Sequence, residues 1–479
     1  MRIAYHHHAA RRASSGAGYF YSDTSRLLAA AGGRVRPQPH DLFQLLLDGD
    51  REQAAFVRSL DVDDVLVCNA GPYGHLFHAL RERHGGRFRI VRDVRTSSWS
   101  GYLLQERLCG ALARAGDRVL FPSEFCRRYF AHHVPGHTGR GSAAACYPLL
   151  AAFPEVARAP AAAGRLRLGY LGRVSVDKGF GTVLDHFARV WHDDHRATLD
   201  VAGAVEGSSP ARQRARIAAR LAELNVPADR VNYRGHLAYA DIWPFLGGLD
   251  VLLFPAVSSV ESLGRVLLEA CHAGVRTVAA AYAAAPEILP AANLMEPVFR
   301  FDESLDLIQP FSFGSVAAEG VVQAVRGSVL DRGVLSDARF QAATYMAHVA
   351  GEDVPDRPAP LAEPVQRFVN ALEIEPGAGV PSADEALREC GLLLSHFRQY
   401  FANGLVDRVA AFWGALQRPP AFPHERQLAW HRLAAPQQRL LTSHARAHCA
   451  AAAFRPVARL RRERWNHEVD SGALHLQAT

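Results

Sequence analysis

Arg173 and Lys178 lie five residues apart in the segment 172–179. A guanidinium group binds a phosphate through two parallel N–H donors, and a lysine ammonium supplies a compact, mobile charge. Together they can bind two phosphates of one ligand. The alternative interpretation is a solvated loop with two ordinary basic residues, and the pair alone does not decide between the two.

Two acidic residues, Glu261 and Glu269, form a second candidate pair, with apolar residues between them. We expect a loop at Glu261 that becomes a helix, which would place Glu269 about two turns further on, on a similar face. Backbone N–H groups of residues 262–265 would then be the unpaired donors at the helix start, a site that favours a diphosphate. A surface helix with two solvated acids is the alternative, but the apolar residues indicate a buried helix.

Each candidate pair follows a predicted strand. The basic pair comes directly after a strand at 167–171, and Glu261 follows a strand at 251–254 and its loop. In open α/β sheets, ligands bind at the edge formed by the carboxyl ends of the strands. Both pairs are therefore expected at one edge of one sheet.

Strands and helices alternate on both sides of the segment 135–164, whose Gly, Ala, Ser and Pro residues are typical of a linker. A first series of strands is predicted at 3–5, 64–68, 88–91 and 118–121, and a second at 167–171, 198–202, 230–233, 251–254 and 277–280. This alternation predicts an α/β fold of two Rossmann-like doubly wound domains. We expect domains at 1–150 and 151–300, then a mainly helical extension at 301–479.

Composition excludes several classes of protein. The chain has 479 residues and a net charge of only +6, which permits a nucleic acid or anionic membrane partner without requiring one. Basic and aromatic residues do not interleave, so no nucleic acid partner is expected. The seven cysteines are scattered and never spaced as C-x-x-C, which argues against a disulfide framework or a zinc site.

We expect a cytoplasmic protein, because the sequence has no signal peptide and no apolar run long enough to span a membrane. Arginines in the segment 455–464 allow peripheral contact with the inner face of the membrane. A solvated helix face is the more common reason for such a charge run.

Six elements occur in a family order. They are G-R-x4-K-G at 172–179, the strand end Val201-Ala202-Gly203, the segment Arg234-Gly235-His236-Leu237, residues 250–255, the E-x7-E pair, and Pro286-Glu287-Ile288. This order resembles the second domain of the GT-B fold retaining glycosyltransferases of family 4. The similarity is strong over residues 165–290 and loose over residues 1–150.

The resemblance implies an enzyme that moves a sugar from a nucleotide diphosphate sugar to an acceptor hydroxyl, with retention of configuration and without a metal or other cofactor. The first domain would bind the acceptor and the second the donor. Arg173 and Lys178 would bind the diphosphate, Glu261 the sugar hydroxyls and Glu269 the ribose hydroxyls. The departing phosphate oxygen would help to deprotonate the acceptor on the same face.

The resemblance also implies the remaining donor-binding residues. Residues 234–237 would border the base, and backbone amides of Ser262, Leu263 and Gly264 would approach the sugar and phosphates. In the first domain, a Gly-rich loop at 16–18 would let the chain pass close to the phosphates. The implied donor-binding set is Gly16, Gly18, Gly172, Arg173, Lys178, Gly203, Arg234, Gly235, His236, Leu237, Glu261, Ser262, Leu263, Gly264 and Glu269.

The catalytic residue of the first domain is less evident. Family members often have a histidine after the fourth strand, but here the segment 91–96 contains none. We rank His75 first, because the segment 71–74 sets it at a loop-to-helix turn, and keep Asp93 and Arg95 as alternatives. The predicted catalytic set is therefore Glu261, Arg173, Lys178 and His75.

Departures from the family pattern leave the donor sugar open. Ser262-Leu263-Gly264 replaces the usual Gly-Phe-Gly, and three alanines at 283–285 replace a Gly-Gly pair. The D-x-D string at 61–63 matches a metal-binding motif but is more simply a solvated turn.

Acceptors of the family range from small molecules and glycans to lipid-linked sugars, and no pattern here chooses among them. GT-B enzymes usually return a terminal helix to the first domain. The extension is longer than that role needs, so we also consider that it covers the acceptor site or forms a homodimer contact.

Three other functions are compatible with the same fold: a GT-B sugar phosphorylase, a nucleotide-sugar epimerase, and a catalytically silent GT-B subunit that binds a partner. The four intact polar residues of the two pairs argue against the silent subunit.

Overall fold

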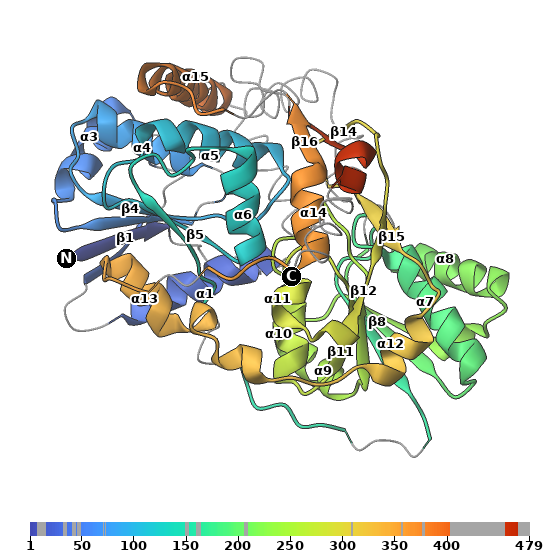
Figure 1. The fold of residues 1–479 in the computed structure, drawn as a ribbon. Coiled ribbons are helices and arrows are strands. Elements are labelled where there is room, and N and C mark those ends of the chain that lie inside the picture. Colours follow the sequence, from blue (N-terminus) through green and yellow to red (C-terminus); the bar gives the residue numbers. More distant parts are fainter. Residues whose placement is uncertain are drawn as a thin grey trace, which may run out of the picture.

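The structure is a computed structural model that describes residues 1–6, 16–31, 36–40, 45, 49–69, 71, 73–148, 153–159, 164–205, 209–307, 310–355, 358–375, 379–402 and 456–467. Within these residues the chain forms two parallel six-stranded sheets, followed by an extension that packs against both (Figure 1). The two sheets confirm the predicted α/β fold of two Rossmann-like units.

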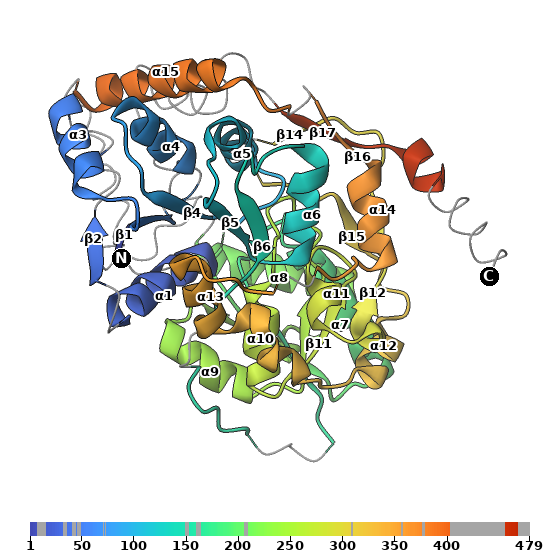
Figure 2. The ribbon, with the colours of Figure 1, turned by 60° about the vertical axis from the view of Figure 1, so that its left-hand side comes forward.

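The first sheet has the strand order β2-β1-β3-β4-β5-β6. Its strands are β1 (Arg2–His6), β2 (Arg36–His40), β3 (Val65–Cys68), β4 (Arg89–Asp93), β5 (Arg118–Phe121) and β6 (Ser142–Ala145). Its helices are α1 (Gly16–Ala30), α3 (Asp50–Ser59), α4 (Gly74–Arg83), α5 (Ser100–Leu112) and α6 (Glu124–His133). Helices α3, α4 and α5 cover one face, and α1 lies on the other (Figure 2). All of β3 is buried, as expected for a parallel strand between two helix layers.

Strand β6 lies inside the segment 135–164 that we expected to be a linker, so that expectation was wrong for residues 142–145. The strand pairs in parallel with β5 at the edge of the sheet. Its sequence, Ser-Ala-Ala-Ala, has none of the β-branched or aromatic residues that signal a strand. Pairing with β5 therefore determines its conformation, and local propensity does not.

The second sheet has the order β12-β11-β10-β7-β8-β9. Its strands are β7 (Arg167–Leu171), β8 (Thr198–Ala202), β9 (Val231–Gly235), β10 (Val251–Phe254), β11 (Arg276–Ala280) and β12 (Leu294–Met295). Its helices are α7 (Phe180–Asp193), α8 (Pro210–Glu223), α9 (Tyr239–Gly247), α10 (Arg265–His272), α11 (Ala285–Ile288) and the short 3-10 turns η1 (Ala228–Arg230) and η2 (Ala291–Asn293). Helices α9 and α10 pack on one face through Leu252, whereas α7 packs on the other through Leu253.

The extension was predicted to be mainly helical, and the structure adds four short strands to its helices, together with β13 at the end of the second domain. The helices are α12 (Val321–Gly327), η3 (Gly333–Ser336), η4 (Ala338–Phe340), α13 (Ala342–Ala350), α14 (Glu363–Ala371) and α15 (Ala383–Ala402). The strands are β13 (Pro297–Phe299), β14 (Leu305–Asp306), β15 (Gly314–Val316), β16 (Leu372–Glu375) and β17 (Val457–Leu460). Strands of two to four residues are too short to show the alternation on which sequence prediction relies.

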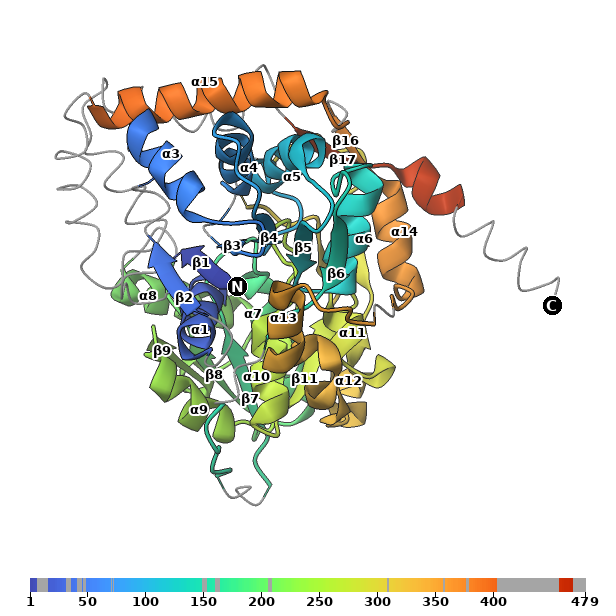
Figure 3. The ribbon, with the colours of Figure 1, turned by 90° about the vertical axis from the view of Figure 1, so that its left-hand side faces the viewer.

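Three helices of the extension, α13, α14 and α15, contact the first domain, and α14 packs against α6. Helix α15 lies along α4 and α5 (Figure 3), and α13 packs beside α1 below the first sheet (Figure 2). Most of the predicted C-terminal helices, at residues 403–455, lie outside the described residues, and so does Arg455. Two other arginines of the basic segment, Arg461 and Arg464, contact the carboxylate of Glu373. Among the described residues, no helix is both long and apolar enough to cross a bilayer.

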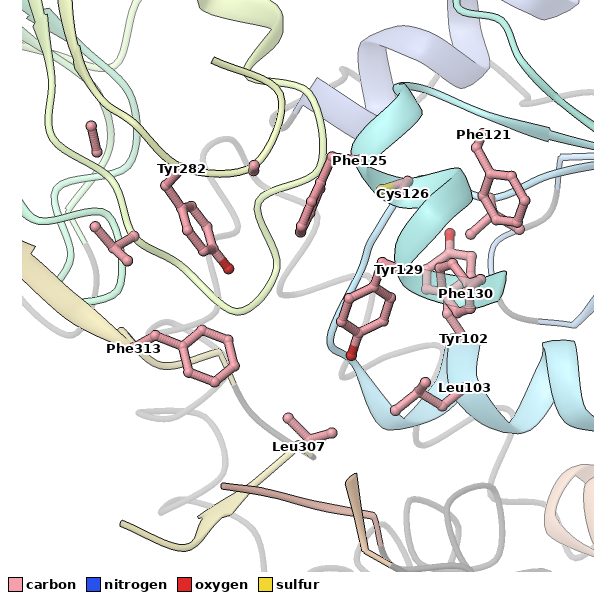
Figure 4. Close-up of a cluster of buried hydrophobic side chains, with 14 of the residues drawn as sticks. Tyr102, Leu103, Phe121, Phe125, Cys126, Tyr129, Phe130, Tyr282, Leu307 and Phe313 are labelled. Carbon is pink, nitrogen blue, oxygen red and sulfur yellow. The ribbon is translucent and has the colours of Figure 1, made fainter. Parts of the chain in front are cut away.

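An apolar cluster joins the two domains and the extension (Figure 4). Phe125 of α6 faces Tyr282 of the second domain, with ring centroids 6.0 Å apart. Leu307 and Phe313 of the extension complete the cluster, and all four side chains are buried. The cluster fixes the carboxyl edge of the first sheet beside that of the second.

Candidate active site

A cavity of about 340 Å³ lies between the carboxyl edges of the two sheets. The second domain lines it with residues from the ends of β7, β8, β9 and β10 and from the start of α10, and the first domain with residues that follow β4, β5 and β6. The lining residues that the sequence predicted are Gly172, Arg173, Lys178, Gly203, His236, Leu237, Glu261, Ser262, Leu263, Gly264 and Glu269. Both predicted pairs therefore meet in one cavity.

Lys178 and Glu261 are in direct contact in this cavity. The Lys178 Nζ atom donates to Glu261 Oε2 at 2.7 Å, and both side chains are mostly buried. The second carboxylate oxygen, Oε1, accepts from the backbone N–H of Ser262 at 3.3 Å. The pair holds an ammonium and a carboxylate side by side where an anionic, hydroxylated ligand can contact both.

A buried aspartate orients Arg173. The Arg173 guanidinium donates to Asp177 Oδ2 at 2.7 Å, and Asp177 also accepts from Ser175 Oγ at 2.6 Å and Ser258 Oγ at 3.1 Å. Asp177 is only 5% exposed. This network holds Arg173 at the cavity wall, because a buried carboxylate with three donors has little freedom to move.

The floor of the cavity requires glycine at position 203. The Gly203 backbone has φ +152°, and a Cβ atom there would lie 1.6 Å from the carbonyl oxygen of Gly172. The loops after β7 and β8 therefore approach each other at backbone distance. Any side chain at 203 would separate these loops and fill the space beside Arg173.

Helix α10 begins at Arg265, three residues later than the predicted start near residue 262. Gly264 is its N-cap, with φ +75° in the left-handed region that favours glycine. The loop 261–264 is instead held by the first domain: the carbonyl of Ser262 accepts from Ser123 Oγ at 2.6 Å, and Ser262 Oγ donates to the carbonyl of Arg95 at 2.8 Å. These hydrogen bonds between residues distant in the sequence hold the loop, so the helix starts later, at Arg265. No local sequence pattern could predict them.

Glu269 lies one turn into α10 and lines the cavity. Its Oε1 atom accepts from Arg265 Nε at 2.8 Å. His236, which lines the cavity after β9, has a lowered pKa because it is partly desolvated by burial. A neutral imidazole therefore faces the region where the resemblance places the nucleotide base.

The first domain contributes Arg95, Thr96, Pro122 and Tyr147 to the lining. Arg95 forms a buried ion pair with Asp93, and Asp93 Oδ2 also accepts from Tyr345 of the extension at 2.9 Å. Burial raises the pKa of Asp93, while the Arg95 guanidinium opposes that rise. Of the three first-domain candidates, Arg95 is the one that reaches the cavity.

His75, which we ranked first, does not line the cavity. It is fully buried in α4, and its carbonyl lies beside Cys390 Sγ of α15. His75 does lie in the first turn of a helix, but that helix packs against α3, α5 and α15. The sequence could not show this, because the position of α15 depends on the whole extension.

Three further predictions differ from the structure. Arg234 is half exposed and pairs with Asp200 at 3.1 Å, and neither Arg234 nor Gly235 lines the cavity. The pairing of β9 with β8 shifts in register at Arg234, and the two residues that follow the strand, 236 and 237, line the cavity instead. Gly16 and Gly18 belong to the first turn of α1, not to a loop before it. Their surroundings lie outside the described side chains.

Sequence reasoning missed several lining residues. Tyr147 follows β6, a strand that the sequence does not indicate, and the helix-start pattern assigns a role only to the backbone N–H of Arg265. The other missed residues are Thr96, Pro122, Tyr170, Leu171, Ala204, Ile242, Phe254, Val260 and Val266. The position of Arg265 between two motif residues was the one available signal.

The D-x-D aspartates, Asp61 and Asp63, are exposed in the turn before β3, as expected. Across the described part of the chain, no cluster of three or more His, Cys, Asp or Glu residues is arranged to hold a metal ion.

Residues 165–297 match a family model described as "Glycosyl transferases group 1". The match covers the second sheet and its loops. A comparison with curated proteins finds no match.

Several solved structures are similar to this chain. The structure of HepE from Anabaena in complex with UDP and glucose has 16% sequence identity, covers 73% of this chain and 94% of that chain, and gives a TM-score of 0.46. Sucrose-phosphate synthase from Thermosynechococcus elongatus has 17% identity, with 84% and 100% covered and a TM-score of 0.46. The lipopolysaccharide outer core galactosyltransferase WaaB has 15% identity, with 74% and 96% covered and a TM-score of 0.45.

Proposed function

We propose that this protein, whose residues 165–297 form a group 1 glycosyltransferase domain, transfers a sugar from a nucleotide diphosphate sugar to an acceptor hydroxyl. The observation that carries the proposal is the meeting of Arg173, Lys178, Glu261 and Glu269 in one cavity at the carboxyl edge of the second sheet. Two cations and two acids in that place suit a ligand that has both phosphates and hydroxyl groups.

Arg173 and Lys178 bind the diphosphate on this proposal, and their charge stabilises it as the bond to the sugar breaks. The first N–H groups of α10 face the same region and add partial positive charge. Glu261, which contacts Lys178, accepts hydrogen bonds from the sugar, and Glu269 accepts them from the ribose. Transfer proceeds with retention of configuration and without a metal, as the resemblance of the motifs implies.

The first-domain wall binds the acceptor. Arg95 and Thr96 line the same cavity as Glu261, and the loop that carries them is hydrogen-bonded to the loop 259–262. An acceptor held there lies beside the donor sugar. Its class, whether small molecule, glycan or lipid-linked sugar, is left open by the residues of this wall.

The test is a thermal-shift screen of UDP, ADP, GDP, CDP and dTDP with the full chain. A nucleotide present at 100 times its dissociation constant should add about 2.7 kcal/mol to the free energy of unfolding. Binding should weaken in Lys178→Ala and stay unchanged in Arg189→Ala, which alters an exposed arginine on α7. Failure of every diphosphate to raise the melting temperature would contradict the proposal.

A second assay separates transfer from the enzymatic alternatives. The enzyme is incubated with a nucleotide sugar alone, and water serves as a slow acceptor. Release of the nucleoside diphosphate, followed by NMR, supports transfer, and the configuration of the newly released sugar reports retention. Conversion to an isomeric nucleotide sugar would instead identify an epimerase.

A further inference from the structure

Arg265, the first residue of α10, connects Glu269 to two other parts of the molecule. Its Nε atom donates to Glu269 Oε1 at 2.8 Å, and its Nη1 atom donates to Asp23 Oδ2 at 2.8 Å. Its Nη2 atom donates to the Tyr239 hydroxyl at 2.8 Å, and Nη1 also lies 3.3 Å from the Tyr147 hydroxyl. One guanidinium thus joins α10, α9 and α1 of the first domain.

The three charged groups that this contact joins are buried, and Asp23 also pairs with the exposed Arg26 at 2.6 Å. Arg265 is 9% exposed, Glu269 5% and Asp23 2%. Burial raises the pKa of Tyr239 to about 12, so its hydroxyl stays neutral and can accept the bond from Arg265. A guanidinium presents its donors in a rigid planar fork, so contacts at three of its nitrogen atoms fix its position and orientation.

The contact matters for Glu269 because a carboxylate accepts through two oxygens. Arg265 donates to Oε1, and a ribose hydroxyl can bond to the same carboxylate at the same time. Without Arg265, a buried acid in an apolar helix start would change its rotamer or take up a proton. Either change would remove the charged acceptor from the place where a ribose would bind.

We propose that Arg265 is a positioning residue that fixes the Glu269 carboxylate for recognition of the nucleotide ribose, and that Asp23 and Tyr239 fix Arg265 in turn. The inference rests on the proposed function, since it assumes a nucleotide in the cavity. It assigns the site a preference for ribonucleotides over 2′-deoxyribonucleotides. It also makes this preference depend on Asp23, a residue of the other domain.

The experiment measures dissociation constants by calorimetry for UDP, ADP and GDP and for their 2′-deoxy counterparts, with the full chain. A hydrogen bond to a charged acceptor predicts that the parent protein binds the best ribonucleotide about tenfold or more tightly than its deoxy form. Glu269→Ala should reduce this ratio to within about twofold of unity, because it removes the acceptor itself.

Arg265→Met should reduce the ratio to a similar value, while the affinity for the 2′-deoxy diphosphate changes less than about threefold. Asp23→Asn should reduce the ratio about threefold, and Arg265→Lys, which keeps the charge but loses the fork, should give an intermediate ratio. Arg189→Met is the matched control, because it removes an exposed arginine, and it should leave the ratio unchanged.

Two results would overturn the inference. One is an unchanged ratio in Arg265→Met. The other is an equal loss of affinity for ribo and deoxy diphosphates, which would show that Arg265 binds the phosphates directly. If Arg265→Met fails to fold, the ratio of ribonucleotide to 2′-deoxyribonucleotide affinity in Asp23→Asn and in Arg265→Lys tests the inference instead. The parent protein's own binding separates the two proposals, because absence of any diphosphate binding contradicts the proposed function itself.

Discussion

The second domain lines the cavity with residues from four consecutive strand ends, whereas the first domain lines it with four residues that follow β4, β5 and β6. On the second-domain side, Lys178 pairs with Glu261 at 2.7 Å and Arg173 with Asp177 at 2.7 Å, both inside that domain. Arg265 also pairs across the domain boundary, with Asp23. On the first-domain side, Arg95 is held by Asp93, which is held in turn by Tyr345 from the extension. The second-domain wall is held mainly by partners inside its own domain, and we call it the local wall. The first-domain wall also depends on a contact from the extension, and we call it the assembled wall.

This difference suggests that the two walls have different roles in the reaction. The local wall carries the two cations and two acids that suit the donor, so changes there should affect the chemical step most. The assembled wall has one cation in the cavity. Its other polar contacts join the loop after β4 to the loop 259–262, and the Tyr147 hydroxyl accepts from Arg265. Changes there should affect acceptor use and stability more than the breaking of the donor bond.

The largest effect is expected from Lys178→Ala. The ammonium meets the negative charge that develops on the departing diphosphate, and removing one such donor costs about 3 kcal/mol of barrier, or a hundredfold in turnover. The measurement is the rate at which nucleoside diphosphate is released from the nucleotide sugar. Lys178→Arg keeps the charge beside Glu261 and should retain more activity, while Arg189→Ala should match the parent. Turnover of Lys178→Ala within tenfold of the parent would remove the distinction between the two walls.

An intermediate effect is expected from Arg95→Ala. This change removes a charged hydrogen-bond donor from the cavity. Because the Arg95 guanidinium also pairs with Asp93, only part of its charge is available to a ligand, and we expect kcat/KM to fall about tenfold, or ~1.4 kcal/mol. Arg95→Lys keeps the ion pair with Asp93 and separates loss of charge from loss of the buried contact. Thermal melting checks that each variant is folded.

His75→Gln sharpens the same comparison, because the sequence favoured His75 and the structure favours Arg95. His75 is buried in α4 away from the cavity, so kcat/KM should stay within about twofold of the parent if the variant folds. A large loss of activity in folded His75→Gln, together with normal activity in Arg95→Ala, would reverse our assignment of the first-domain wall.

The contrast between the walls also explains how much the sequence could predict. The two parallel sheets could be predicted from apolar strand segments separated by turn and loop residues. The donor-side residues could be predicted from motifs with fixed spacing after those strands. Arg173 and Glu269 were found this way. Their exact partners were not, since Asp177 was seen only as a spacer and Arg265 only as backbone.

The other wall required knowledge of the tertiary structure. Tyr147 follows β6, a strand whose alanines carry no strand signal, and His75 is placed by α15, which lies more than 300 residues later. The start of α10 was misplaced by three residues because Ser123 and the Arg95 carbonyl hold the preceding loop. Each of these features depends on long-range contacts, and a single sequence contains no direct record of such contacts.

A small effect on turnover, together with a measurable loss of stability, is expected from Ser123→Ala. Ser123 Oγ accepts from the backbone N–H of Cys126 at 3.2 Å, which caps α6, and donates to the Ser262 carbonyl across the domain boundary at 2.6 Å. Losing the cap and the bond should lower the free energy of unfolding by about 1–2 kcal/mol, measured in urea.

Turnover of Ser123→Ala should stay within about threefold of the parent, because the Ser123 hydroxyl contacts the backbone of the loop and not the predicted ligand groups. Ser123→Thr retains a hydroxyl and should recover most of the stability, while Ser336→Ala, at an exposed turn, should change neither quantity. A loss of turnover above tenfold at unchanged stability would mean that the assembled wall takes part in the chemical step, and the division between the two walls would then fail.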